Sequence, residues 1–164
     1  MKRAYEKTLA RRVGAINVKQ ANISGQIGEG KMQLSLDLAA DHFSQTVQGL
    51  IIVKPGTLAL GADYAFASGE RKLPVKLDAD VYKDSVRIKL PSGYQIDEMP
   101  DPVRMKGPYG TYQASWKADG SDLVFEQSTE VPDALVPAAQ YTDLRTYFDK
   151  IGSSQASPVV LVKK

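Results

Sequence analysis

The stretch TYQASWKADGSDLVFEQSTEV, residues 111–131, decides the fold class of the chain. Apolar and polar residues alternate from Tyr112 to Trp116, which is the period of a strand with one buried face. The Asp-Gly pair at 119–120 follows, and glycine accepts the positive φ angles that a tight hairpin turn requires. Leu123 and Phe125 then lead the return strand. The stretch therefore predicts a β-hairpin.

Strand patterns recur on both sides of this hairpin. Alternation of a buried and a solvated face returns in KMQLSLDLAA (31–40), LPVKLDADVYK (73–83) and DSVRIKLP (84–91). TVQGLIIVKP (46–55) contains a continuous apolar run instead, which indicates a strand buried on both faces. The less regular GAINVKQANIS (14–24) predicts a strand with a β-bulge between Val18 and Ile23. Glycine, proline, serine and aspartate separate these short strands, a pattern typical of a sandwich.

The end of the chain departs from this pattern. After Pro137, which suits a first helical turn, the apolar residues recur at spacings of three and four residues and form one stripe: Tyr141, Leu144, Phe148 and Ile151. Gly152 provides a stop, and PVVLV (158–162) reads as a last strand. A helix this short is marginal alone in water, so its stripe must dock on other residues. We expect the helix to cap an open edge or end of the sandwich.

These patterns together predict a mainly β protein. The architecture is an antiparallel β-sandwich, immunoglobulin-like in the broad sense, with one short C-terminal helix and a final strand. At 164 residues the chain is the size of one domain with one core. The segment KRAYEKTLARR (2–12) has helical character but no convincing apolar stripe.

Composition excludes several classes of function. The chain contains no cysteine, so it has no thiol nucleophile and no disulfide. Its net charge is +2, which gives no electrostatic case for binding nucleic acid. The basic residues gathered in 2–12 are interpreted as a solvated linker or helix, because one tyrosine, Tyr5, does not amount to the repeated aromatic interleaving of a nucleic-acid surface. The longest apolar runs, such as Leu50 to Val53, have four residues and are far too short to span a membrane.

Acid, base and metal chemistry also finds little support. His42 is the single histidine, and no G-x-S-x-G motif accompanies it, so we expect no serine triad and no zinc site. Asp78, Asp80 and Asp84 lack the glycine and distal glutamate of a calcium loop and are interpreted as a solvated strand face. The prediction is therefore a chain without catalytic residues, metal site or cofactor.

Two further groups have more than one interpretation. Asp97, Glu98 and Asp101 are close in sequence, but the prolines around them indicate an extended connection rather than a glycosidase pair. Tyr109, Tyr112 and Trp116 are either core residues, which the alternation favours, or a stacking platform for a sugar or peptide.

The second half of the chain resembles a known family. The residues that carry the resemblance are Leu90, Pro91, Gly93 and Tyr94, then Gly110 and Tyr112, and then Tyr141, Leu144, Arg145, Tyr147 and Phe148. They resemble the carboxy-terminal domain of unknown function that follows the core of bacterial transglutaminase-like proteins. The resemblance covers residues 70–164 well and the first 70 residues loosely. None of these motif residues carries chemistry.

The resemblance implies a function as well as a fold. In that family the catalytic residues belong to the preceding transglutaminase-like core, so no catalytic residue is carried over to this chain. It implies a non-catalytic accessory domain that supports or positions this core, in the periplasm or cell envelope. Residues 1–12 are then the remnant of a connector, and residues 13–164 a single domain. The alternative is a binding module for cell-envelope peptide or glycan.

Overall fold

The computed structural model describes residues 2–26, 30–41, 43–60, 64–67 and 69–164. The chain divides into two compact units, residues 1–45 and 46–164. The domain bounds expected from the sequence, 1–12 and 13–164, stay a prediction. Among the described residues, no helix is long and apolar enough to cross a membrane.

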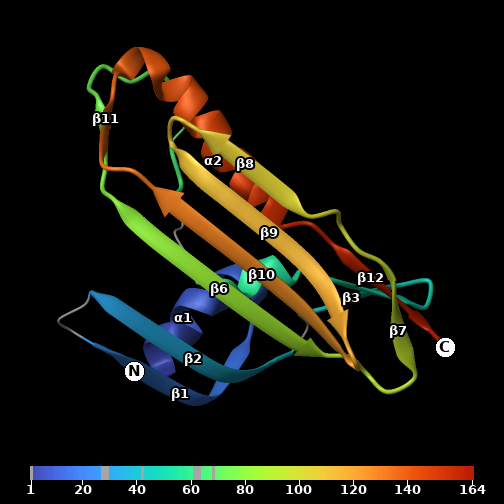
Figure 1. The fold of residues 1–164 in the computed structure, drawn as a ribbon. Coiled ribbons are helices and arrows are strands. Elements are labelled where there is room, and N and C mark those ends of the chain that lie inside the picture. The colour runs from blue at the N-terminus through green and yellow to red at the C-terminus, as the bar shows by residue number, and fades with distance from the viewer. Residues whose placement is uncertain (1, 27–29, 42, 61–63, 68) are drawn as a thin grey trace. The chain divides into compact units, whose positions relative to one another are not determined.

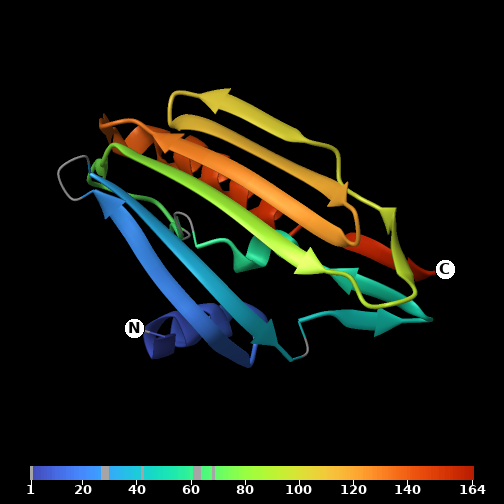
Figure 2. The ribbon, with the colours of Figure 1, turned by 60° about the horizontal axis from the view of Figure 1, so that its bottom comes forward.

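The first unit is a two-stranded ribbon with one helix. α1 (Lys2–Val13) precedes β1 (Ile16–Gln26) and β2 (Lys31–Ala40), which pair as antiparallel neighbours (Figure 2). The register shifts between Val18 and Gln20, which confirms the predicted bulge. The backbone N–H of Val18 donates to the Glu6 carboxylate at 3.0 Å, and this bond ties the helix to the ribbon. Leu9 of α1 is fully buried, although the helix has no regular apolar stripe.

The second unit contains the sheet that the opening hairpin predicted. Its strands lie in the order β6 (Asp80–Lys89), β10 (Asp122–Val131), β9 (Gly110–Asp119) and β8 (Val103–Gly107), all antiparallel (Figure 1). The hairpin β9–β10 is therefore the centre of the sheet, and β6 and β8 are its edges.

A second four-stranded sheet belongs to the same unit. Its order is β3 (Gln45–Val47), β4 (Leu50–Val53), β12 (Val159–Lys163) and β7 (Tyr94–Glu98). The predicted final strand is thus an inner strand of this sheet, between β4 and β7. The expectation that β4 is buried on both faces is wrong: Leu50 is 36% exposed and only Val53 is buried. The neighbouring edge strand β3 is short and exposed, so it does not cover this end of β4.

Shorter elements connect the two sheets. They are the two-stranded pair β5 (Val75–Leu77) with β11 (Ala134–Val136), and the 3-10 turns η2 (Pro55–Leu58) and η3 (Ala138–Gln140). The predicted fold class is confirmed: the protein is mainly β, its antiparallel sheets pack as a sandwich, and it ends with a helix and a strand.

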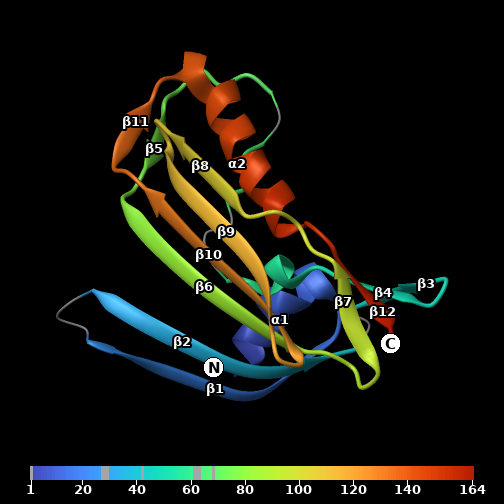
Figure 3. The same cartoon turned by 45° about the vertical axis from the view of Figure 1, so that its right-hand side comes forward.

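The C-terminal helix α2 (Tyr141–Gln155) buries the predicted stripe, and the rings of Tyr141 and Phe148 both pack on Phe66. Tyr141, Leu144, Phe148 and Ile151 are all buried. The ring of Tyr147 lies next to Gly107 of β8, and α2 runs alongside β8 in Figure 3. Ser154 and Gln155 of α2 contact the inward-facing Tyr112 and Gln127, so the helix lies against a face of the sheet, and the expectation that it caps an open edge or end of the sandwich is wrong. One apolar stripe of about four turns matches a flat sheet face better than a sheet edge, where backbone groups are exposed.

Candidate functional site

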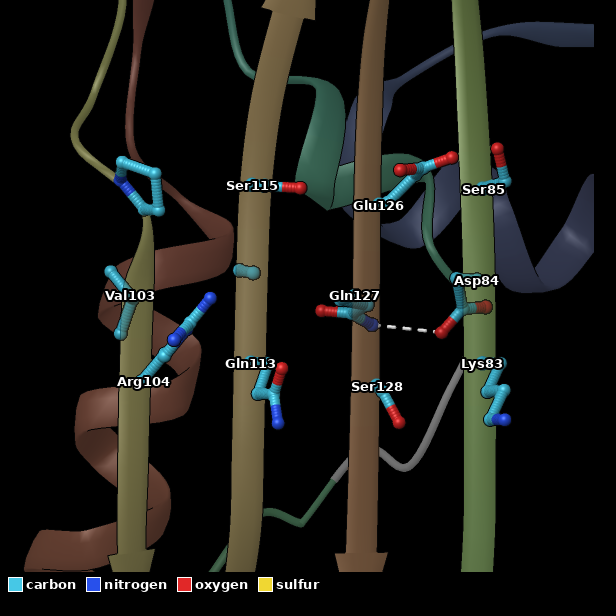
Figure 4. A pocket seen from close by; sticks show the side chains of 12 residues that line it. Lys83, Asp84, Ser85, Val103, Arg104, Gln113, Ser115, Glu126, Gln127 and Ser128 are labelled. Atoms are coloured by element: carbon cyan, nitrogen blue, oxygen red, sulfur yellow. Dashed lines mark hydrogen bonds between the residues drawn. The ribbon is translucent and has the colours of Figure 1, made fainter.

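A trough crosses the face of the first sheet that is turned away from α2. Its volume is about 420 Å³, and all four strands contribute to it (Figure 4). The alternation along the strands places the lining residues: apolar residues face the core, and the polar residues between them face outward.

The strand register places the trough residues in two rows. In one row, Lys83 of β6 pairs with Ser128 of β10, which pairs with Gln113 of β9, which pairs with Arg104 of β8. In the next row Ser85, Glu126 and Ser115 are neighbours. The floor therefore presents hydroxyl and amide groups from the central strands. The two edge strands supply a cation at each end of the first row.

The two carboxylates of the trough have partners, whereas its two cations form no ion pair among the described residues. Lys117 Nζ lies 3.0 Å from Glu126 Oε2, so that carboxylate is already paired. The carboxylate of Asp84 points to the core side, where it accepts hydrogen bonds from Gln127 Nε2 at 2.8 Å and the backbone N–H of Leu60 at 3.0 Å. Within the part of the chain that is described, neither Lys83 nor Arg104 forms an ion pair.

A buried polar network lies beneath the trough. The Tyr112 hydroxyl donates to Gln127 Oε1 at 3.3 Å and lies 3.2 Å from Ser154 Oγ, and Gln155 Nε2 donates to the same Gln127 oxygen at 3.1 Å. Burial is the main cause that raises the pKa of Tyr112. Each polar group in this network finds a partner that water would otherwise supply, so the network joins α2 to β9 and β10.

The aromatic residues from Tyr109 to Trp116 belong to the core. Tyr109, Tyr112 and Trp116 are at most 6% exposed. Their interpretation as core residues is therefore confirmed, and their interpretation as a stacking platform is wrong. Trp116 packs on Phe125 with ring centroids 5.3 Å apart. Its indole Nε1 is buried, and no described residue accepts a hydrogen bond from it.

The three aspartates of the DADVYKD stretch differ in their surroundings. Asp78 and Asp80 are exposed, as the interpretation as a solvated strand face requires, whereas Asp84 is half-buried and hydrogen-bonded. For Asp84 that interpretation is wrong, because β6 turns its even-numbered residues inward from Tyr82 on. Asp80 accepts a hydrogen bond from the Tyr82 hydroxyl, and this bond raises the pKa of Tyr82 to about 12.

The remaining predicted groups form no site within the described residues. Asp97, Glu98 and Asp101 are exposed. Among the residues that the structure describes, no three histidine, cysteine or acidic side chains gather where they could hold a metal ion. His42 lies outside the described residues.

The sequence patterns do not predict the trough. Each strand shows only an ordinary polar face, and the trough exists because four such faces become neighbours. The one feature of the sequence that relates to the trough is the presence of short side chains at outward positions: Ser85, Ser115 and Ser128. The order of the strands, which no local pattern encodes, was needed to bring them together.

The motif LPSGY forms a corner between the two sheets. The N–H of Leu90 donates to the Ser121 carbonyl at 3.0 Å, and Gly93 adopts φ +80 and accepts from the N–H of Lys164 at 2.8 Å. Tyr94 then begins β7. A second hollow of about 710 Å³ lies at this corner, lined mainly by the turn itself. The motif therefore fixes the passage from β6 to β7 and the position of the last strand.

Comparison with protein families gives a match over most of the chain. Residues 49–161 match DUF3858, described as a Domain of Unknown Function with solved-structure structure. This range covers most of the second unit: it includes the first four-stranded sheet and α2 completely, and the second four-stranded sheet except for β3 and the last two residues of β12. No curated protein and no solved structure matches the chain significantly.

Proposed function

The chain belongs to the DUF3858 family, and from this premise we propose that it is a non-catalytic accessory β-sandwich domain that supports or positions a transglutaminase-like core of the same polypeptide. The proposal assigns the chain a mechanical role. The domain presents a rigid surface to its neighbour and leaves the bond chemistry to that neighbour.

The observation that carries the proposal is the position of the motif residues. Tyr112 and Leu144 are fully buried, Phe148 is nearly so, and Gly93 fixes a corner of the backbone. Gly110 lies so close to the Glu130 carbonyl that no larger residue fits there. The motif residues of an enzyme surround its reacting group, whereas the motif residues of this chain build a core and its turns. A scaffold role is the function that such a set of residues supports best.

The chemistry of the chain supports the same proposal. A transglutaminase-like reaction needs a thiolate nucleophile with a histidine base, and the sequence contains no cysteine. The trough offers serine hydroxyls, but Ser85, Ser115 and Ser128 have no histidine among the residues that line it. A hydroxyl without a base close by is a weak nucleophile at neutral pH.

Two measurements test the accessory role. The purified chain is expected to release no ammonia from a glutamine peptide and to hydrolyse no amide; turnover that disappears in His42→Ala would refute the non-catalytic part. Next, a transglutaminase-like core encoded upstream of the chain is expressed with and without the domain. We expect the joined protein to resist heat inactivation for longer. Equal half-lives and equal activities of the two forms would refute the supporting role.

The proposal also places the domain in the periplasm or cell envelope. This location follows from the resemblance to exported transglutaminase-like proteins. It is tested by fractionating cells that express the full-length protein with an epitope at its carboxyl end. Recovery of the epitope in the cytoplasmic fraction alone would contradict it.

A second candidate function is a binding module for cell-envelope peptide or glycan. The outward trough favours it, because a concave surface with convergent polar groups is a common form of ligand site. The aromatic residues from Tyr109 to Trp116 do not favour it, because they are buried. Binding of soluble cell-wall fragments to the chain, measured by calorimetry, tests this candidate; heats equal to those of buffer dilution would refute it.

A further inference from the structure

We propose that the trough on the first sheet binds an extended acidic peptide segment that carries two carboxylates four residues apart. The inference rests on the second candidate function, the binding module, and names its ligand class. It uses the sheet face that α2 leaves open.

The first argument is the charge of the trough. Four charged residues line it: Lys83, Arg104, Asp84 and Glu126. Both carboxylates are already engaged, Glu126 by Lys117 and Asp84 by the hydrogen bonds on its core side. The two cations are exposed and have no ion-pair partner within the described residues. A ligand that complements this surface brings negative charge to both ends.

The second argument is the distance between the cations. Lys83 and Arg104 stand in the same row on the two edge strands, so three interstrand spacings separate them, about 14 Å in total. An extended peptide rises roughly 3.3 Å per residue, and its residues i, i+2 and i+4 face the same side. Carboxylates at i and i+4 therefore reach both cations from one face of the peptide, at a separation of about 13 Å.

The third argument is the floor between the cations. Ser128 and Gln113 occupy the middle of the row, with Ser115 beside them. Hydroxyl and amide groups donate and accept hydrogen bonds, so they can pair with the N–H and C=O groups of a peptide that lies across the strands. Short side chains also leave the depth that such a backbone needs.

A glycan fits the same surface less well. Sugar rings gain much of their affinity by packing on aromatic faces. The outward positions of β6, β8, β9 and β10 carry no aromatic residue, because Tyr82, Tyr112, Trp116 and Phe125 all belong to the inward rows. Single-stranded nucleic acid also depends on aromatic stacking and is disfavoured for the same reason.

The test measures peptide binding by fluorescence anisotropy. The probe is a labelled peptide of about five residues with glutamates at both ends and neutral β-branched residues between them. We expect saturable binding that weakens as sodium chloride rises from about 0.05 to 0.5 M, since salt screens exposed charges. Control peptides replace both glutamates with glutamines or place them next to each other, and we expect both to bind more weakly. Absence of saturable binding up to about 1 mM, or equal binding of the glutamine peptide, would overturn the proposal.

Variants locate the binding to the trough. Lys83→Gln and Arg104→Gln are each expected to weaken binding about two- to fivefold, and the double variant about five- to twentyfold. Lys150→Gln, an exposed cation on α2, is the matched control and should leave the affinity unchanged. Unchanged affinity in the double variant would overturn the proposal, as would displacement of the peptide by a neutral chitin or glucan hexasaccharide. The heat resistance of the joined core protein should be the same in the double variant, so failure of this inference and failure of the accessory role are distinguishable.

Discussion

Phe148 on α2 offers the most direct test of how the second unit is held together. Its side chain is 3% exposed. Three rings surround it: the centroid of Tyr64 lies 4.4 Å away, and those of Phe66 and Tyr147 each lie 5.3 Å away. Truncating a buried phenylalanine to alanine typically costs about 3–5 kcal/mol, because apolar transfer energy is lost and a cavity remains. Tilted aromatic pairs add to the loss, so we expect a value of about 4–5 kcal/mol for Phe148→Ala.

The expected loss is large against the total stability of a domain. Such domains unfold with about 5–15 kcal/mol, so the variant should be close to the limit of folding. With a slope of about 2 kcal/mol per molar urea, the midpoint of unfolding should fall by about 2 M. Urea titrations followed by far-ultraviolet circular dichroism and by the fluorescence of Trp116, the single tryptophan, measure this shift.

Two further variants separate the loss of ring packing from a general effect on the helix. Lys150→Ala changes an exposed side chain of the same helix and should alter stability by less than about 0.5 kcal/mol. Phe148→Leu keeps most of the apolar volume but loses the ring contacts, so its cost should be about 1–2 kcal/mol. A loss below about 1 kcal/mol in Phe148→Ala would refute the reasoning, because it would mean that α2 does not depend on its stripe for docking.

Four other outcomes follow from the structure. Gly110→Ala should destabilise the fold by about 2–6 kcal/mol, because Gly110 has φ +136 and an added Cβ would meet the backbone of the facing strand. Gly120→Ala should cost only about 1–2 kcal/mol, because Gly120 has φ +60 but open space around it. Equal urea midpoints for the two variants would contradict this. Trp116 is 6% exposed, so iodide should quench its emission little in the folded chain and strongly in urea. The pKa of Tyr82 is raised to about 12 in the folded chain and is about 10 in the unfolded chain, so its contribution to stability is complete below pH 10 and lost as the pH rises toward 12. In Tyr82→Phe the urea midpoint should therefore decline less steeply at alkaline pH. An unchanged slope would contradict this assignment. Calcium or EDTA should leave the melting temperature unchanged, and a rise of several degrees with calcium would reveal a site.

Local patterns predicted the elements well because their causes are local. The hairpin at 111–131 needs only alternation and an Asp-Gly turn, and both lie within one stretch of sequence. The stripe on α2 likewise follows from the 3.6-residue period. α1 was harder to predict, because Leu9 is its single fully buried apolar residue among those described, and one residue makes no stripe.

The arrangement of the elements required information that no local pattern holds. Nothing in β6 or β10 indicates that Phe125 faces Val86, yet that register sets which outward side chains become neighbours. Val124 illustrates the same limit: it stands in an outward row and is nevertheless 2% exposed. Its partners in the register are Arg87 and Lys117, whose long aliphatic stems can cover a small residue between them.

The core and the trough are connected through alternation along the strands. Asp84 points inward between Lys83 and Ser85, and Gln127 points inward between Glu126 and Ser128. The hydrogen bond from Gln127 to Asp84 therefore fixes two adjacent strands at the level of both trough rows. Because a buried polar network has few alternative arrangements that satisfy every group, it holds the backbone in one register. The outward side chains then start from fixed positions, so a ligand that fits them loses little free energy in ordering the site. The same bonds that complete the core of this domain thus give its open face a defined shape.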